Sequence, residues 1–251
     1  MKTISVWIVV VIVMGVPLCL GQTLRKAEDY YNRGIARHEA GDIEGAIADF
    51  SKAIEIFPRF SSAYERRGAA RKAKGDIEGA LADFSQAIQI NPDLALPYYN
   101  RGFIFLENQK FDDAIKDFDK ALELQPKLAV VYRNRGDAKK AKGDVPGAIA
   151  DYSKVIEIQP QNADAYYERG NLRQTSGDVD GAIADFSRTI EIDSHYAEAY
   201  ADRGLARLRQ GLDAEAQKDF DRYIELNSNN KDLLEQRIKY AKYLRDKKPK
   251  S

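Results

Sequence analysis

Cysteine, histidine, tryptophan and methionine are scarce in this sequence of 251 residues. The chain has one Cys, two His, one Trp and two Met. One Cys and two His are too few for a thiolate zinc site, and one Cys cannot form a disulfide framework. It also lacks an excess of either charge, because 39 Lys and Arg balance 39 Asp and Glu. A neutral chain is not expected to bind nucleic acid, since phosphate recognition relies on surplus Lys and Arg. These shortages exclude zinc-thiolate, disulfide-stapled and nucleic-acid-binding proteins from the expected classes.

A long hydrophobic run occurs only at the N-terminus. Residues 4–20 are uncharged, and the sequence turns polar after Gly21. This pattern predicts residues 1–21 as a secretory signal peptide, with an uncleaved membrane anchor formed by residues 4–20 as the alternative. Lipidation of Cys19 is a weaker alternative, because the two residues before it are not small. We therefore expect an exported protein, periplasmic or secreted, that touches a membrane only through this segment if it stays attached.

The rest of the sequence repeats every 34 residues. The dipeptide Arg-Gly recurs at this interval with a tyrosine three residues before it, an alanine 12 residues after the glycine and an aromatic residue four further on. The glycines are Gly34, Gly68, Gly102, Gly136, Gly170 and Gly204, and the aromatic residues are Phe50, Phe84, Phe118, Tyr152, Phe186 and Phe220. A fixed period of this length is typical of a solenoid of stacked units.

Each unit contains two helical stripes separated by a turn. Gly41 and Asp42 form the turn of the first unit, as helix terminator and as N-cap of the next helix, and the pair recurs in the second, fourth and fifth units. The second helices of the first four units are closed by Pro58, Pro92, Pro126 and Pro160. A glycine inside a helix costs about 1 kcal/mol relative to alanine. A glycine column with this cost is expected only where a Cβ would collide with a neighbouring side chain. We therefore expect Gly34 to face Phe50 of the paired helix, with the same contact in every unit.

These columns resemble the tetratricopeptide repeat (TPR) family, whose signature combines an aromatic, a small residue, an alanine, an aromatic and a terminal proline at these spacings. The resemblance implies an all-α fold, a right-handed superhelical α-solenoid of six helix-turn-helix repeats. The expected segments are a linker at 22–26 and repeats at 27–60, 61–94, 95–128, 129–162, 163–196 and 197–230. One departure is that most units carry Arg or Lys, such as Arg37, where the family has an apolar residue. We expect these side chains to keep their charged ends in water.

The C-terminal part of the chain predicts half of a further repeat. Leu234, Arg237 and Ile238 continue the first-helix columns, with Ile in the place of the glycine. Residues 231–247 are therefore expected to form a capping helix that closes an open stack, followed by a basic tail at 248–251.

No catalytic constellation is visible in the sequence. His38 and His195 lack partners at metal-ligand spacing, and neither a phosphate-binding glycine loop nor a Gly-x-Ser-x-Gly elbow occurs. The acidic column that includes Asp49 and Asp185 follows the repeat period, so we expect it to pair with the Arg column, at about 0–1 kcal/mol for each exposed pair. The sequence predicts a protein that is not an enzyme and has no cofactor or metal.

In the family that the chain resembles, the first helices line a concave face that commonly holds a peptide, which implies a protein or peptide partner. Counting from the tyrosines places Ile35, His38, Glu65 and Ala69 among the inward positions. The predicted partner-binding residues are Tyr31, Lys72, Leu96, Tyr99, Phe103, Leu106, Arg133, Lys140, Tyr167 and Asn171. A family clamp for terminal carboxylates is not expected in its usual form, because Tyr31 and Ile35 occupy its first positions.

The third unit is apolar on this face where its neighbours are charged. An apolar patch rimmed by Lys72, Arg133 and Lys140 has the composition of a binding hot spot. The alternative is that Phe103 and Leu106 pack between adjacent repeats. The sequence leaves both interpretations open.

Together these features predict a non-enzymatic scaffold that binds a peptide or protein on the concave face of a TPR superhelix, outside the cytoplasm. The alternative is an accessory subunit of a cell-envelope assembly, held by an uncleaved N-terminal anchor. The identity of the partner and the oligomeric state are left open by the residues.

Overall fold

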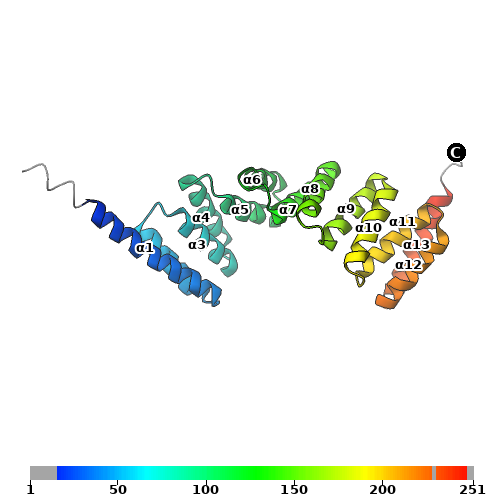
Figure 1. The fold of residues 1–251 in the computed structure, drawn as a ribbon, viewed down its shortest axis with the longest axis horizontal. Helices are drawn as coiled ribbons and strands as arrows, with labels where there is room; N and C mark the ends of the chain where they lie inside the picture. Colours follow the sequence, from blue (N-terminus) through cyan, green and yellow to red (C-terminus); the bar gives the residue numbers. More distant parts are fainter. Residues whose placement is uncertain (1–15, 228–229, 248–251) are drawn as a thin grey trace, which may run out of the picture. The chain divides into compact units, whose positions relative to one another are not determined.

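The protein, seen in a computed structural model, is built from helices joined by short turns (Figure 1). The structure describes residues 16–227 and 230–247, with side chains from residue 21 onward. Within these ranges there are thirteen α-helices and no strand, which confirms the predicted all-α solenoid class. The helices are α1 (Val16–Glu39), α2 (Ile43–Ile56), α3 (Ser61–Lys74), α4 (Ile77–Ile90), α5 (Ala95–Glu107), α6 (Phe111–Leu124), α7 (Ala129–Ala141), α8 (Val145–Ile158), α9 (Ala163–Ser176), α10 (Val179–Ile192), α11 (Ala197–Arg209), α12 (Asp213–Leu226) and α13 (Lys231–Asp246).

The helices fall into two compact units, the first ending at Pro126 and the second beginning at Lys127. In the first unit, α1 pairs with α2, α3 with α4 and α5 with α6, and successive pairs join where α2 meets α3 and α4 meets α5. In the second unit, the pairs are α7–α8, α9–α10 and α11–α12, and α13 packs against α11. Each 34-residue segment expected from the sequence thus contains one helix pair, and α13 takes the place expected for the capping helix.

At the N-terminus, the structure differs from the predicted linker and does not describe most of the predicted signal peptide. Residues 22–26, expected as a linker, are instead a continuous part of α1, because neither proline nor glycine interrupts them. The expected signal peptide lies outside the described residues up to residue 15, and the basic tail at 248–251 lies outside them entirely. None of the described helices combines the length and the hydropathy needed to cross a membrane.

The close approach of the paired helices depends on the glycine column. A Cβ added at Gly34 would lie 2.7 Å from the ring of Phe50, and a Cβ at Gly170 would lie 2.8 Å from the ring of Phe186. Real Cβ atoms do not approach other atoms so closely, so only glycine fits without a shift of the ring. The rings themselves are fully buried between the two helices of a repeat. This geometry confirms the glycine–aromatic contact expected from the spacing.

The turns inside the repeats also follow the sequence pattern. Asp42 caps α2 by accepting a hydrogen bond from the backbone amide of Gly45 at 2.9 Å, and Asp76, Asp144 and Asp178 do the same for α4, α8 and α10. The glycine before each cap has a positive φ, for example +89° at Gly75. In the third repeat the left-handed residue is Gln109, with φ 58°, and Lys110 provides no side-chain cap. The third turn therefore keeps the backbone path of the others with less favourable residues.

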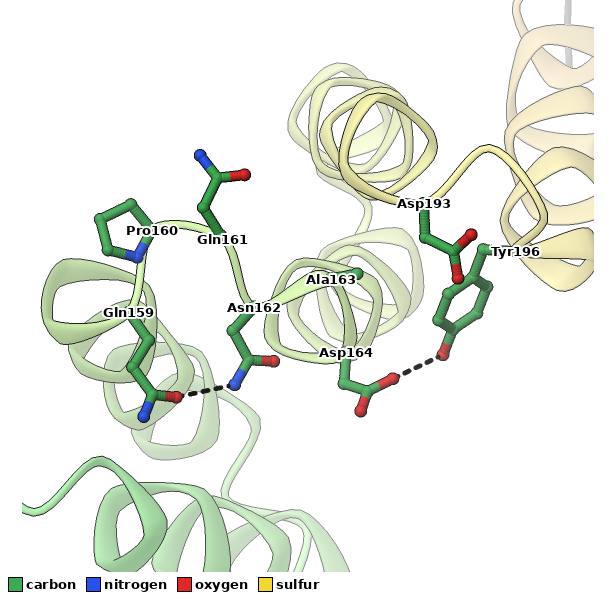
Figure 2. A pocket seen from close by; sticks show the side chains of 8 residues that line it. All are labelled: Gln159, Pro160, Gln161, Asn162, Ala163, Asp164, Asp193 and Tyr196. Atoms are coloured by element: carbon green, nitrogen blue, oxygen red, sulfur yellow. Dashed lines mark hydrogen bonds between the residues drawn. The ribbon is translucent and has the colours of Figure 1, made fainter.

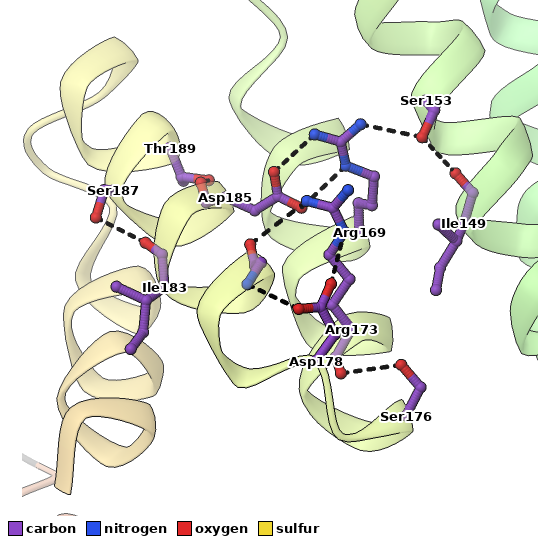
Figure 3. A network of polar contacts seen from close by, with 11 residues as sticks. Ile149, Ser153, Arg169, Arg173, Ser176, Asp178, Ile183, Asp185, Ser187 and Thr189 are labelled. Carbon is purple, nitrogen blue, oxygen red and sulfur yellow. Dashed lines mark hydrogen bonds and ion pairs between the residues drawn. The ribbon is translucent and has the colours of Figure 1, made fainter. Parts of the chain in front are cut away.

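A ladder of Arg–Asp ion pairs with buried carboxylates joins the two helices of each repeat, as Figure 3 shows for the fifth repeat. Arg169 donates two hydrogen bonds to Asp185, at 2.9 and 2.7 Å, and a third to the hydroxyl of Ser153 in the preceding repeat, at 3.0 Å. The same Arg–Asp pair occurs in all six repeats, and the aspartates are only 2–4% exposed. The expectation of exposed pairs is therefore wrong for the aspartates of this column, because packing of the paired helices removes their carboxylates from water, while the arginine side chains are 14–55% exposed.

The second basic column binds the same aspartates. Arg173 lies 2.9 Å from Asp185 through Nη1, and Arg37, Arg71, Lys139 and Arg207 approach their own aspartates in the same way. The expectation that these side chains keep their charged ends in water is thus wrong. They lie along the helix pair with the charged end held by a buried carboxylate, which two cations neutralise together. In the third repeat Phe105 takes this place and lies 6.0 Å from the guanidinium of Arg101.

Candidate functional site

The first helices of the first unit, α1, α3 and α5, form a surface that we call the first-helix face. It contains two hollows that share Arg66. The Glu65 hollow, of about 180 Å³, is lined by Tyr31, Ser62, Glu65, Arg66, residues 93–97 and Gln125. The Ile35 hollow, of about 40 Å³, is lined by Ile35, His38, Glu39, Phe50, Arg66 and Ala69. Both lie where the sequence places the inward positions of the first three repeats.

Glu65 is the most unusual group of this face. It is only 7% exposed although it lines an open hollow. Its Oε1 accepts a hydrogen bond from Nδ2 of Asn100 on α5, at 3.1 Å, and Nε of Arg66 lies 3.4 Å from Oε2. Removal from water raises the pKa of the Glu65 carboxyl above its ordinary value, and Arg66 and Asn100 oppose that rise only in part. The hollow thus holds a carboxylate whose charge is incompletely compensated.

Tyr31 is the only predicted binding residue on α1, and it serves two purposes. Its ring lies 4.9 Å from that of Phe60 and 5.8 Å from that of Phe50, and it packs against a core cluster that includes Ala63 of the second repeat. The same side chain lines the Glu65 hollow. Tyr31 is therefore a half-buried packing residue, and its remaining surface lines the Glu65 hollow.

The apolar residues of the third repeat are distributed between packing and exposure. Tyr99 contacts the rings of Phe103 and Phe118 at 6.3 and 6.2 Å, and Nζ of Lys72 lies 3.8 Å from the centroid of the Phe103 ring. These contacts, together with a half-buried Leu106, are those of the packing alternative. Leu96 differs, because it is 45% exposed at the rim of the Glu65 hollow.

The remaining predicted residues belong to the second unit. Tyr167 donates a hydrogen bond to Oδ2 of Asp202 at 2.8 Å and is hydrogen-bonded with Asn171, and burial raises the pKa of its hydroxyl. Lys140 pairs with Glu168 at 2.8 Å, and Arg133 is exposed. The structure thus brings Tyr167 and Asn171 together, and the two basic residues belong to the second unit, whereas the apolar patch belongs to the first.

A larger hollow of about 590 Å³ lies in the second unit (Figure 2), between the junction of the fourth and fifth repeats and the junction of the fifth and sixth repeats. It is lined by residues 159–164, Asp193 and Tyr196. Its polar groups largely satisfy one another, since Asn162 donates to Gln159 at 2.9 Å and caps α9, while Tyr196 donates to Asp164 at 3.2 Å. The hollow contains no buried charge comparable with Glu65, so the first-helix face of the first unit is the stronger candidate.

The sequence placed Glu65 among the inward positions but did not single it out. Its column holds Tyr31, Glu65 and Tyr99 in the first three repeats, so a carboxylate between two aromatic residues was a usable signal. Its burial could not be predicted from the sequence, because it depends on Asn100 of the next repeat, which donates a hydrogen bond to it, and on residues 94–97, which line the same hollow.

The two histidines do not form a metal site with their surroundings. His38 lines the Ile35 hollow, and His195 is exposed beside Asp193. Within residues 16–227 and 230–247, no group of three or more His, Cys, Asp or Glu side chains is placed to hold a metal ion.

Three family models match the chain. One described as TPR repeat matches residues 68–109 and 136–177, and two described as Tetratricopeptide repeat match residues 27–60 with 95–128, and residues 167–231. A search among curated proteins gives no match.

Several solved structures resemble the fold. The crystal structure of MamA protein shares 27% identity at a TM-score of 0.63, covering 68% of this chain and 93% of that chain. YrrB, described as a TPR protein with an unusual peptide-binding site, shares 20% identity at a TM-score of 0.69, covering 77% and 97%. PilF of Pseudomonas aeruginosa shares 16% identity at a TM-score of 0.69, covering 87% and 99%. The last two likenesses show the fold alone.

Proposed function

Because the chain belongs to the tetratricopeptide repeat family, we propose that it binds an extended segment of a partner protein on its first-helix face, without enzymatic activity. The family and the structural likeness to MamA and YrrB support the coarser function class, a protein–protein interaction scaffold. The peptide-binding site named for YrrB agrees with a peptide as the bound element.

One observation supports this face above others in the described residues. The Glu65 hollow combines an exposed Leu96 and an aromatic Tyr31 with a buried carboxylate on neighbouring first helices. Binding sites for extended peptides need apolar pockets for side chains beside polar groups that fix orientation. The adjoining Ile35 hollow provides a second recess for a neighbouring residue of the same peptide.

Photocrosslinking tests the proposed face. A benzophenone amino acid at Leu96 or Ile35 is expected to form adducts with a partner that an excess of unlabelled protein suppresses. The matched control carries the same probe at Glu123, an exposed position on the second helix of the third repeat. Equal adduct formation at all three positions would contradict binding on the first-helix face.

We also propose that the protein acts outside the cytoplasm. The uncharged residues 4–20 after a basic start support export, and the same stretch supports the second candidate, an envelope-assembly subunit held by an uncleaved anchor. Sequencing of the N-terminus of the purified protein, combined with cell fractionation, distinguishes the two. A new terminus near Gln22 supports release, and an intact terminus in the membrane fraction supports the anchor. An intact terminus in the cytoplasmic fraction contradicts both.

A further inference from the structure

The Glu65 carboxylate has weaker support than the carboxylates of the ladder. In the same repeat, Asp83 accepts three hydrogen bonds from the guanidinium groups of Arg67 and Arg71, at 2.7–2.9 Å. Glu65 has one neutral donor, Asn100, and one guanidinium at 3.4 Å from Oε2. The side chain of Arg66 is 48% exposed, so water screens its charge. An ionised carboxylate has about four acceptor positions, and this one retains unused capacity.

The lining of the hollow has a net negative charge. Its charged residues are Glu65, Asp93 and Arg66, two acidic against one basic. Its apolar wall consists of Tyr31, Leu94, Leu96 and neighbouring residues. Long basic side chains have an aliphatic stem and a cationic end, which match an apolar wall that leads to a buried carboxylate.

We propose that the Glu65 hollow binds a lysine or arginine side chain of the partner peptide, with the cation at the Glu65 carboxylate and the aliphatic stem against Leu96 and Tyr31. This inference rests on the proposed peptide-binding role of the first-helix face. It adds a sequence preference, a basic residue at one position of the bound segment.

The repeat pattern supports a specific role for this carboxylate. The matching positions in the other repeats hold Tyr31, Tyr99, Arg133, Tyr167 and Ala201, so Glu65 is the only acidic residue of its column. Burial raises the pKa of Glu65, so ionising this carboxyl in the folded protein lowers stability. Groups that lower stability in this way are concentrated at functional sites.

A small cation tests the hollow without a partner. The protein, labelled with ¹³C at the glutamate carboxyls, is titrated with n-butylammonium and separately with neutral n-butanol while NMR follows Glu65. We expect n-butylammonium to shift the Glu65 resonance, to lower the pKa of this carboxyl and to bind at least fivefold more tightly than n-butanol. Equal effects of the two probes, or no effect of either, would overturn the assignment of the hollow to a cation.

A peptide selection tests the sequence preference. Random dodecapeptides displayed on phage are selected on the wild type, on Glu65→Gln and on the matched control Glu78→Gln, which removes an exposed charge from the first turn of α4. We expect lysine and arginine to be enriched at one position by the wild type and by Glu78→Gln, and this enrichment to be lost with Glu65→Gln. Circular dichroism confirms that each variant retains its helices.

The two experiments separate the inference from the proposed function. Peptides that bind without enrichment of basic residues would refute the inference and leave the proposed function intact. Absence of any bound peptide, together with tight binding of n-butylammonium at Glu65, would refute the proposed peptide-binding function and keep the cation site.

Discussion

The glycines that face aromatic rings differ in how much room each has for a methyl group. At Gly170 an added Cβ would meet the Phe186 ring at 2.8 Å, whereas at Gly136 it would meet Tyr152 and Asp151 at 3.4–3.5 Å. The fourth repeat carries Tyr152 in place of phenylalanine, and its hydroxyl donates to Oδ1 of Asp137 at 2.5 Å. This bond accompanies a ring position farther from the glycine, so the fourth repeat tolerates a side chain where its neighbours do not.

We predict opposite effects of alanine at these two glycines. Gly136→Ala should raise the free energy of unfolding by about 0.5–1 kcal/mol, because alanine favours the helix and makes only ordinary contacts. Gly170→Ala should lower it by about 1–3 kcal/mol, because a fully buried ring must move. Urea unfolding followed by circular dichroism measures both. A stabilising Gly170→Ala would mean that the aromatic ring does not restrict this position.

The ladder aspartates should be the charged residues on which stability depends most. Asp185→Asn leaves Arg169 and Arg173 facing a neutral amide in a buried site, and we expect a loss of about 3–5 kcal/mol. The control lies in the same helix: Glu191 forms an exposed pair with Arg188, so Glu191→Gln should change stability by less than about 0.5 kcal/mol. Similar urea midpoints for the two variants would show that the ladder is no stronger than a surface pair.

Among the elements, the turn of the third repeat reaches the common geometry with unfavourable residues. Gln109 has φ 58°, whereas the matching turn position of the other five repeats is a glycine, such as Gly75 with φ +89°. Gln109→Gly should therefore stabilise the protein by about 1 kcal/mol, and Gly75→Ala, which has free space around the added methyl, should destabilise it by about the same amount. Thermal unfolding of the two variants provides the comparison. A destabilising Gln109→Gly would indicate that the glutamine side chain contributes interactions that outweigh its backbone strain.

The helix pairs were predictable because each is determined by local and recurring columns. The spacing of Gly34, Phe50 and Pro58 fixes two helices and their contact within one unit. The third turn lacks the Gly-Asp signal, yet its hairpin forms because the flanking helices carry the same columns. The continuation of α1 through residues 22–26 was missed, because the periodic pattern that predicted the helix begins only at Ala27.

The candidate site was less predictable, because it depends on contacts between repeats. The sequence placed Tyr31 and Leu96 on the same face, but it did not show that Tyr31 packs on Phe60 while Leu96 stays exposed. The buried Glu65 was assigned an inward position without its partners. Periodicity predicts which face a side chain occupies, whereas burial depends on which side chain of the next repeat covers it.

For the whole molecule, stability should depend on pH in two opposite ways. Pairing with Arg33 lowers the pKa of Asp49 below its ordinary value of 3.8, so the stability that Asp49 contributes is lost as the pH falls through its lowered pKa. Burial raises the pKa of Glu65 above 4.5, so its contribution is present at low pH and is lost as the pH rises through its raised pKa.

We predict that Glu65→Gln removes only the loss of stability that accompanies ionisation of Glu65 as the pH rises. At pH values above the raised pKa of Glu65 the variant should melt at a higher temperature than the wild type, because the buried charge is gone. Below pH 4 both proteins should lose stability together, since Asp49 is unchanged. Melting temperatures from pH 2 to pH 9 test this. A variant that melts lower than the wild type at pH 7 would contradict the incomplete compensation of Glu65.

The hydrogen bond from the arginine of one repeat to the serine of the preceding repeat has an evolutionary consequence. Arg67 reaches Ser51, Arg101 reaches Ser85, Arg169 reaches Ser153 and Arg203 reaches Ser187, all at 3.0–3.1 Å. Since these four joints use the same hydrogen bond, an in-frame duplication of a 34-residue segment that carries both the arginine and the serine would recreate this bond at the new boundary. Such a duplication would need no compensating substitution for this hydrogen bond.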